Sequence, residues 1–179
     1  HVLVHSMNRP LRIMFSGVEN SGKSTLAKSI SEILGWELIP EMCRHNDEVL
    51  RVEETPEILS SLHKLQEEMA IQASKRAEEG VICDTGGLEL EMWSKIKFNE
   101  VLNLKSVLKI DFCFFCETLP VWEEDPIRQM PKFKDRKQYE ALFYEAHILK
   151  GTPFAVLPPV SLDGRIELVL SKLKDLQNE

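Results

Sequence analysis

Short apolar runs alternate with longer stretches of helical periodicity along the chain. We expect strands at the apolar runs 11–17, 36–41, 81–85, 111–117 and 153–158. Helical patterns separate them at 22–34, 55–80, 88–98, 100–109 and 137–150, and a last amphipathic helix follows Ser161 and Asp163. Strands that alternate with helices are typical of βαβ units, whose sheets are parallel. The pattern therefore predicts an α/β fold.

Composition limits the classes of protein that the chain can belong to. With 179 residues it is long enough for one well-buried core but short for two, so we expect residues 7–179 to form a single domain and residues 1–6 to be an expression remnant. No apolar run approaches the roughly 18 residues of a membrane span, which argues against a membrane role. The net charge of −7 argues against nucleic acid as a partner, although a local basic patch stays open.

The cysteines give no sign of disulfide or metal chemistry. No signal peptide precedes Cys43, Cys83, Cys113 and Cys116, so we expect a reducing cytoplasm. Cys113 and Cys116 form a C-x-x-C within an apolar strand, where positions i and i+3 point to opposite faces of the sheet. We therefore interpret them as inert core residues.

The segment FSGVENSGKSTLAKSI (15–30) carries the clearest chemistry. Gly17, four further residues and then Gly22-Lys23-Ser24-Thr25 have the spacing of a phosphate-binding P-loop, between an apolar strand and a helical pattern. Backbone N–H groups and the N-terminal end of the helix would bind phosphate, while Ser24 would coordinate Mg²⁺. We expect ATP to contact Gly17, Glu19, Asn20, Ser21, Gly22, Lys23, Ser24 and Thr25.

The P-loop alone fits a kinase, a GTPase or a motor. Asp84-Thr85-Gly86-Gly87 supplies the D-x-x-G of a GTPase, but the sequence contains no N-K-x-D motif, so we interpret the match as incidental. Larger motor ATPases need more chain than this. The residues therefore favour a small P-loop phosphotransferase.

Polar residues at the carboxyl ends of predicted strands are candidates for phosphoryl transfer, because ligands of parallel sheets bind at that edge. Glu41 could accept the proton of an attacking hydroxyl, with Arg44 one turn later; the alternative is a helix-start acid. Asp84 could hold Mg²⁺ or the hydroxyl, unless it is a structural N-cap. Gln66, or equally Gln72, could contact the substrate from the long helix.

The polar stretch 119–137 has the composition of a lid. It carries Arg128, Lys132, Lys134, Arg136 and Lys137, which could close over the phosphates and stabilise the transferring group. We expect Arg128 and Arg136 to contact ATP; the alternative is a solvated loop. Trp93 and Trp122 could stack on a planar acceptor ring, or they could have ordinary packing roles.

Four signatures together resemble the nicotinamide-riboside-kinase-like P-loop family, whose type member is the kinase domain of a bifunctional bacterial NAD-salvage regulator. They are GVENSGKST, PEMCR, CDT followed by Trp93, and W-x-x-D-x-x-R at Trp122, Asp125 and Arg128. The resemblance implies a nucleoside-kinase-like, five-stranded parallel sheet of order 2-3-1-4-5 with helices on both faces. It also implies ATP and Mg²⁺ as cofactors and a ribosyl 5′-hydroxyl as the acceptor.

Two hypotheses of function follow. The first is a small-molecule kinase, with nicotinamide riboside as the best single acceptor. In it, Lys23 and Arg128 stabilise phosphoryl charge, Ser24 and Asp84 organise Mg²⁺, and Glu41 deprotonates the acceptor. Arg44, Gln66, Trp93, Trp122 and Asp125 then complete the acceptor site. The second is a small ATPase that acts as a nucleotide-dependent switch, which should expose an apolar patch near the lid.

Overall fold

The computed structural model describes residues 9–46 and 53–179. The expected expression remnant at 1–6 lies outside the described residues. Within them, no helix combines the length and the apolar character needed to cross a bilayer.

A five-stranded parallel sheet forms the centre of the structure. Its strands are β1 (Leu11–Ser16), β2 (Glu37–Ile39), β3 (Gly80–Asp84), β4 (Phe112–Cys116) and β5 (Phe154–Leu157). They lie in the order β2-β3-β1-β4-β5, and every neighbouring pair is parallel. The predicted strand positions and strand order are both confirmed.

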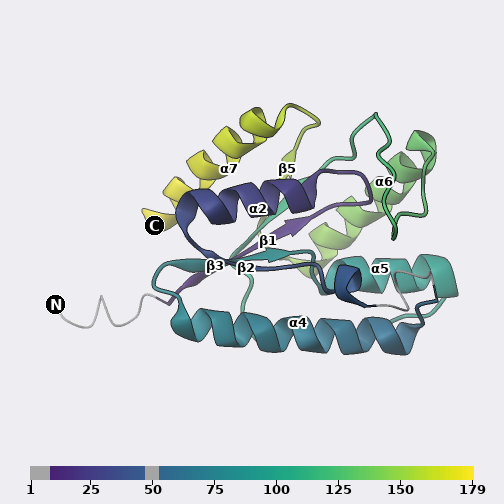
Figure 1. Ribbon diagram of the computed structural model, residues 1–179, viewed down its shortest axis with the longest axis horizontal. Helices are drawn as coiled ribbons and strands as arrows, with labels where there is room; N and C mark the ends of the chain where they lie inside the picture. Colours follow the sequence, from purple (N-terminus) through teal and green to yellow (C-terminus); the bar gives the residue numbers. More distant parts are fainter. Residues whose placement is uncertain (1–8, 47–52) are drawn as a thin grey trace.

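Helices cover both faces of the sheet, as Figure 1 shows. On one face lie α2 (Lys23–Leu34) and α7 (Leu162–Gln177), and on the other lie α4 (Pro56–Arg76), α5 (Gly87–Phe98) and α6 (Phe133–Lys150). Alternate residues of β1 point to opposite faces, because successive side chains of a strand do so. Phe15 packs in the cluster beneath α2 and α7, whereas Met14 packs with Ala70 of α4.

The cysteine prediction is confirmed for the strand β4. Cys116 packs in the cluster beneath α2 and α7, and Cys113 packs on the opposite face of the sheet. Both are buried free thiols, as is Cys83. The C-x-x-C is therefore a consequence of an apolar strand that is buried on both faces.

The predicted helix at 100–109 is wrong, because that segment has no regular structure. Asn99 ends α5 in the left-handed conformation, with φ of 52°. Side chains from other elements then bind the backbone that a helix would use: Glu91 accepts the Leu104 N–H, His63 bonds the Lys105 carbonyl and Arg12 donates to the Leu108 carbonyl. Tertiary hydrogen bonds thus replace helical ones at these positions.

The first residues of α4 and α6 can be compared with the helix starts expected from the sequence. Thr55 caps α4, with its hydroxyl accepting the Ile58 N–H at 3.3 Å, as predicted.

α6 begins at Phe133, earlier than the expected residue 137, so the end of the predicted lid is helical. The connection between β4 and α6 is therefore 117–132, which we call the β4–α6 loop. It lies beside the start of α2, beyond the carboxyl end of β1 (Figure 1).

Candidate active site

The turn between β1 and α2 has the backbone of an anion-binding loop. Gly17, Asn20 and Gly22 lie at positive φ values of 152°, 58° and 75°, which glycine and asparagine adopt most readily. A Cβ atom at position 17 would lie 2.6 Å from the Cys116 carbonyl oxygen, so only glycine fits there. α2 begins at Lys23 without a side-chain cap. The unpaired N–H groups and the helix dipole attract anions, so this turn could hold the phosphates of a nucleotide.

The hydroxyl residues of the turn differ in their surroundings. Ser21 Oγ is buried and has no hydrogen-bond partner in the described residues. The Ser24 hydroxyl acts to lower the pKa of the Asp84 carboxyl group, and Thr25 lies at an exposed position of the first turn of α2. A hydroxyl beside a carboxylate could hold Mg²⁺, whose remaining ligands are typically phosphate oxygens and water.

Arg165 of α7 fixes this turn to the ends of two strands. The side chain is buried and donates to the carbonyl oxygens of Ser21, of Glu117 after β4 and of Pro158 after β5; the last two distances are 2.8 Å. One guanidinium presents its donors as a rigid fork, so it can hold three backbone segments at once. The sequence does not predict this role of Arg165, because a charged residue in an amphipathic helix gives no sign of burial.

Lys23 lies among carboxylates. Burial lowers its pKa, but the surrounding negative charges outweigh that effect and raise the pKa above the ordinary value. These charges belong to Glu41, Asp84 and Glu89. Burial and the charge of Glu41 together raise the pKa of Asp84 to about 6. Such a concentration of negative charge suits a site that receives a cation.

The turn after β3 is strained at Thr85. This β-branched residue has φ of 69°, a conformation that costs of order 1–3 kcal/mol and that persists where surrounding contacts impose it. The Thr85 N–H donates to the Phe15 carbonyl at 2.9 Å. Gln66 Nε2 donates to the carbonyl oxygens of Asp84 and Thr85 at 3.1 and 2.7 Å. The structure therefore places the Gln66 amide against the backbone of this turn, where it positions Asp84 and Thr85.

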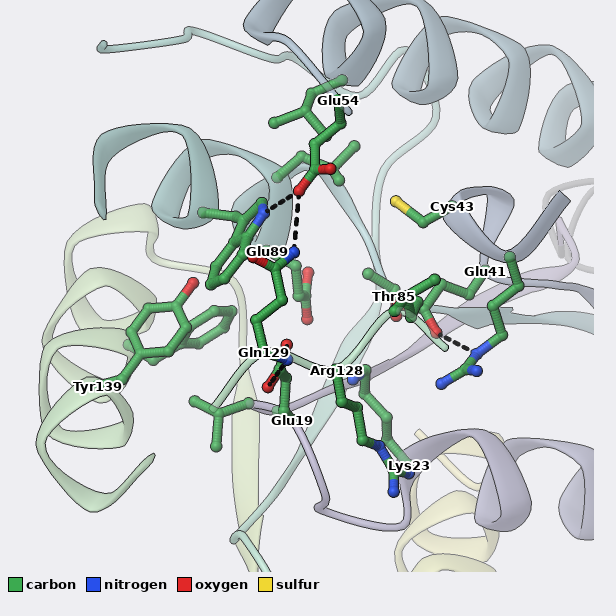
Figure 2. Close-up of a pocket in the computed structure, with 18 residues that line it drawn as sticks. Glu19, Lys23, Glu41, Cys43, Glu54, Thr85, Glu89, Arg128, Gln129 and Tyr139 are labelled. Carbon is green, nitrogen blue, oxygen red and sulfur yellow. Dashed lines mark hydrogen bonds and ion pairs between the residues drawn. The ribbon is translucent and has the colours of Figure 1, made fainter. Parts of the chain in front are cut away.

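A cavity lies beyond the carboxyl ends of the strands and beneath the β4–α6 loop (Figure 2). The predicted residues that line it are Gly17, Glu19, Lys23, Glu41, Arg44, Trp93 and Arg128. The other predicted residues do not line it; they are Asn20, Ser21, Gly22, Ser24, Thr25, Gln66, Asp84, Trp122, Asp125 and Arg136. One side of the cavity is apolar, with Trp93, Tyr139 and Phe143. Figure 2 shows Glu41, Thr85 and Lys23 toward one end and Glu54 toward the other.

Arg44 links Glu41 to the β4–α6 loop. Its guanidinium donates to Glu41 Oε2 at 3.1 Å and to Asp125 Oδ2 at 2.5 Å. Asp125, a predicted substrate contact, is thus bound to a protein cation at the cavity wall. This arrangement fixes the orientation of the Glu41 carboxylate relative to the loop.

Two P-loop side chains bind the β4–α6 loop directly. The Glu19 carboxylate accepts the N–H groups of Gln129 and Met130 at 2.9 and 2.7 Å. Asn20 donates to the carbonyl oxygens of Leu119 and Val121 and accepts from the Glu123 N–H and from Arg128. Glu19 and Asn20, which were predicted to contact ATP, therefore connect the phosphate-binding turn to the loop above it.

Trp122 and Arg136 stabilise the β4–α6 loop itself. Arg136 is fully buried and donates to Thr118 Oγ1 and to the carbonyl oxygens of Leu119, Met130 and Pro131. Its guanidinium lies 5.1 Å from the centroid of the Trp122 ring. Arg136 thus has its donors committed to the protein, which differs from the predicted contact with ATP.

Several residues that line the cavity were missed by the sequence analysis. They are Val18, Cys43, Glu54, Leu59, Thr85, Glu89, Leu90, Ile127, Gln129, Tyr139 and Phe143. Glu89 accepts the Gly86 N–H in the first turn of α5, which the short spacing in DTGGLE could have indicated. Burial raises the pKa of Glu89 to about 7. Glu54 and Tyr139 follow no motif, because their roles depend on tertiary packing.

Solved structures of other proteins share this architecture. No curated protein sequence matches the chain. The structure is similar to deoxyadenosine kinase from M. mycoides with bound dATP (TM-score 0.58, 19% identity, 92% of this chain and 100% of that chain). It is also similar to thymidylate kinase from Candida albicans (TM-score 0.63, 16% identity, 95% and 93% of the two chains).

A third similar structure is the NadR protein in complex with NR, with a TM-score of 0.58 and 15% identity. The match covers 83% of this chain and 45% of that chain. These similarities establish the fold, an α/β sheet of the kind found in P-loop nucleoside and nucleotide kinases. The sequence model of one family, described as an AAA domain, matches residues 12–165. Because this match spans most of the chain, the protein belongs to that AAA domain family.

Proposed function

We propose that this protein is an ATP- and Mg²⁺-dependent kinase that phosphorylates a hydroxyl of a riboside-type metabolite, with nicotinamide riboside as the first acceptor to test. The observation that carries the proposal is the cavity that Lys23 and Glu41 share with the ring of Trp93. It provides a phosphate-binding lysine, a carboxylate and an apolar wall within one hollow. The fold similarity to nucleoside and nucleotide kinases supports the same conclusion.

Different residues in and around the cavity can have different roles in phosphoryl transfer. ATP would supply the γ-phosphate, and Mg²⁺ would neutralise its charge beside Ser24 and Asp84. Glu41 takes the proton of the acceptor hydroxyl as the new oxygen–phosphorus bond forms and the bond to the departing ADP breaks. Lys23 and Arg128 stabilise the charge on the transferring group. The β4–α6 loop serves as the lid that excludes water.

The rival hypothesis of a nucleotide-dependent switch draws on two exposed side chains beside the same loop. Val121 is 74% exposed and Phe133 is 44% exposed. A switch could present such side chains to a protein partner. A cavity lined by Glu41 and Trp93 has no role in that hypothesis, so we favour the kinase.

Steady-state release of ADP from Mg·ATP tests the proposal. The purified chain should release ADP slowly alone and much faster with one member of a panel of ribosides that includes nicotinamide riboside. Mass spectrometry should then detect the phosphorylated riboside. Binding of ATP with slow hydrolysis that no riboside stimulates would instead favour the switch.

A further inference from the structure

A buried carboxylate lies in the cavity away from the P-loop. Glu54 precedes the Thr55 cap of α4 and is 4% exposed. Its Oε1 atom accepts three hydrogen bonds: from Trp93 Nε1 at 3.1 Å, Lys97 Nζ at 2.7 Å and Gln129 Nε2 at 3.1 Å. Figure 2 shows Glu54, with its hydrogen bond to Gln129, at the end of the cavity away from Glu41 and Lys23.

The second oxygen of this carboxylate is unpaired. Glu54 Oε2 is buried and has no hydrogen-bond partner in the described residues. Burial raises the pKa of Glu54, but the hydrogen bonds from Lys97 and Trp93 outweigh burial and lower it, so the group is ionised near neutral pH. A buried carboxylate oxygen without a donor is unfavourable, and such groups usually have a partner. Glu54 lines the cavity, so a ligand bound there could supply the missing donor.

The surroundings of Glu54 limit the chemistry of that donor. The ammonium group of Lys97 already balances the charge of Glu54, so the incoming group needs a hydrogen-bond donor but no positive charge. The ring of Trp93 donates to Glu54, and Tyr139 lies beside it with ring centroids 6.5 Å apart. Flat apolar walls of this kind favour a planar ring. A carboxylate in the same place would face Glu54 and be repelled.

We infer that Glu54 Oε2 accepts a hydrogen bond from a primary amide or amino group on the planar ring of the acceptor, and so discriminates against acceptors that carry a carboxylate there. The inference rests on the proposed function, which places the reacting hydroxyl near Glu41 and Lys23. An acceptor that spans the cavity would bring its hydroxyl to one end and its ring substituent to the other. Glu54 would then determine which ring is accepted, while Glu41 acts on the hydroxyl.

Nicotinamide riboside and nicotinic acid riboside provide a matched test. They differ only in one ring substituent, which is an amide in the first and a carboxylate in the second. We expect kcat/KM of the wild-type chain to favour the amide by roughly 100-fold or more, since a site built for a hydrogen-bond donor rejects analogues that lack it. In Glu54→Gln, whose amide can donate to a carboxylate, this ratio should fall by about 10-fold or more. Glu57→Gln, at an exposed position in the first turn of α4, should keep the wild-type ratio.

The outcomes separate this inference from the function on which it rests. Equal kcat/KM for the two ribosides in the wild-type chain would overturn the inference and leave the kinase intact. An unchanged ratio in a folded Glu54→Gln protein would do the same. Turnover of neither riboside would overturn nicotinamide riboside as the acceptor, and the inference with it. The wild-type comparison requires no variant, so it decides the question even where Glu54→Gln fails to fold.

Discussion

Asn20 in the P-loop binds Arg128 in the loop above it, with Oδ1 accepting from a guanidinium nitrogen at 3.2 Å. The same side chain also holds the backbone of that loop at Leu119, Val121 and Glu123. One residue of the phosphate-binding turn thus orients a cation that lines the cavity. Movement of the turn and movement of the proposed lid should therefore be coupled.

The Asn20→Ala variant tests this coupling. It removes the hydrogen bonds to the loop, and loss of about 1.4 kcal/mol would raise the open population about tenfold. We expect trypsin to cleave the folded variant within 117–132 about ten times faster than the wild-type protein. Asn103→Ala, which alters an exposed asparagine in another loop, should be cleaved there at the wild-type rate. Equal cleavage of Asn20→Ala and wild type would show that Asn20 does not hold the loop.

Substitution of Arg136 tests whether this residue stabilises the β4–α6 loop or contacts ATP, as the sequence suggested. Arg136→Met leaves carbonyl oxygens of the β4–α6 loop without their buried donor, so the free energy of unfolding should fall by roughly 2–4 kcal/mol. Urea denaturation would measure the change, with Lys134→Met at an exposed position of the same helix as the control. Unchanged stability together with weakened ATP binding would instead support the predicted contact with ATP.

His147 should make the protein sensitive to acid. It is buried among the rings of Phe115, Phe143 and Phe154 and bonds Ser16 Oγ at 2.8 Å. Burial lowers its pKa from 6.5 to about 4. The unfolded chain then binds this proton more tightly than the folded protein does. Stability from the neutral ring is therefore complete above pH 6.5 and is lost as the pH falls toward 4, by about 3 kcal/mol in all.

Urea denaturation between pH 7 and pH 4 would measure this loss. His147→Leu should remove about 3 kcal/mol of the decline, because leucine does not titrate. Asn103→Ala, which changes an exposed residue that does not titrate, should leave the decline in place. The same pH dependence in His147→Leu and wild type would contradict the assignment.

The sequence predicted the sheet and the P-loop well because both depend on local patterns. Apolar runs identify buried strands, and Gly17, Gly22 and Lys23 have a spacing that fixes the turn. The errors arise where distant residues decide the structure. Helical periodicity at 100–109 is overridden by side chains such as His63 and Arg12, which bind that backbone from other elements.

In the candidate site, too, local patterns predict some residues and distant contacts determine the others. Glu41, Arg44 and Trp93 follow predicted strands closely, and the structure brings them to one cavity. Glu54 reaches that cavity from the residue before a helix cap, and no spacing in the sequence relates it to Trp93, 39 positions away. Arg136 has the composition of a lid cation, but only the folded loop shows that its donors are already used.

Transfer of labelled γ-phosphate from Mg·ATP to nicotinamide riboside tests the central claim most directly, with wild type compared against Glu41→Gln. We predict labelled riboside phosphate from the wild-type chain and a rate lower by roughly 10²- to 10⁴-fold in the variant, with ATP binding kept, because Glu41 acts as the general base. Glu57→Gln should transfer label at the wild-type rate. Label released only as inorganic phosphate, at equal rates in wild type and Glu41→Gln, would contradict the kinase and its assigned base.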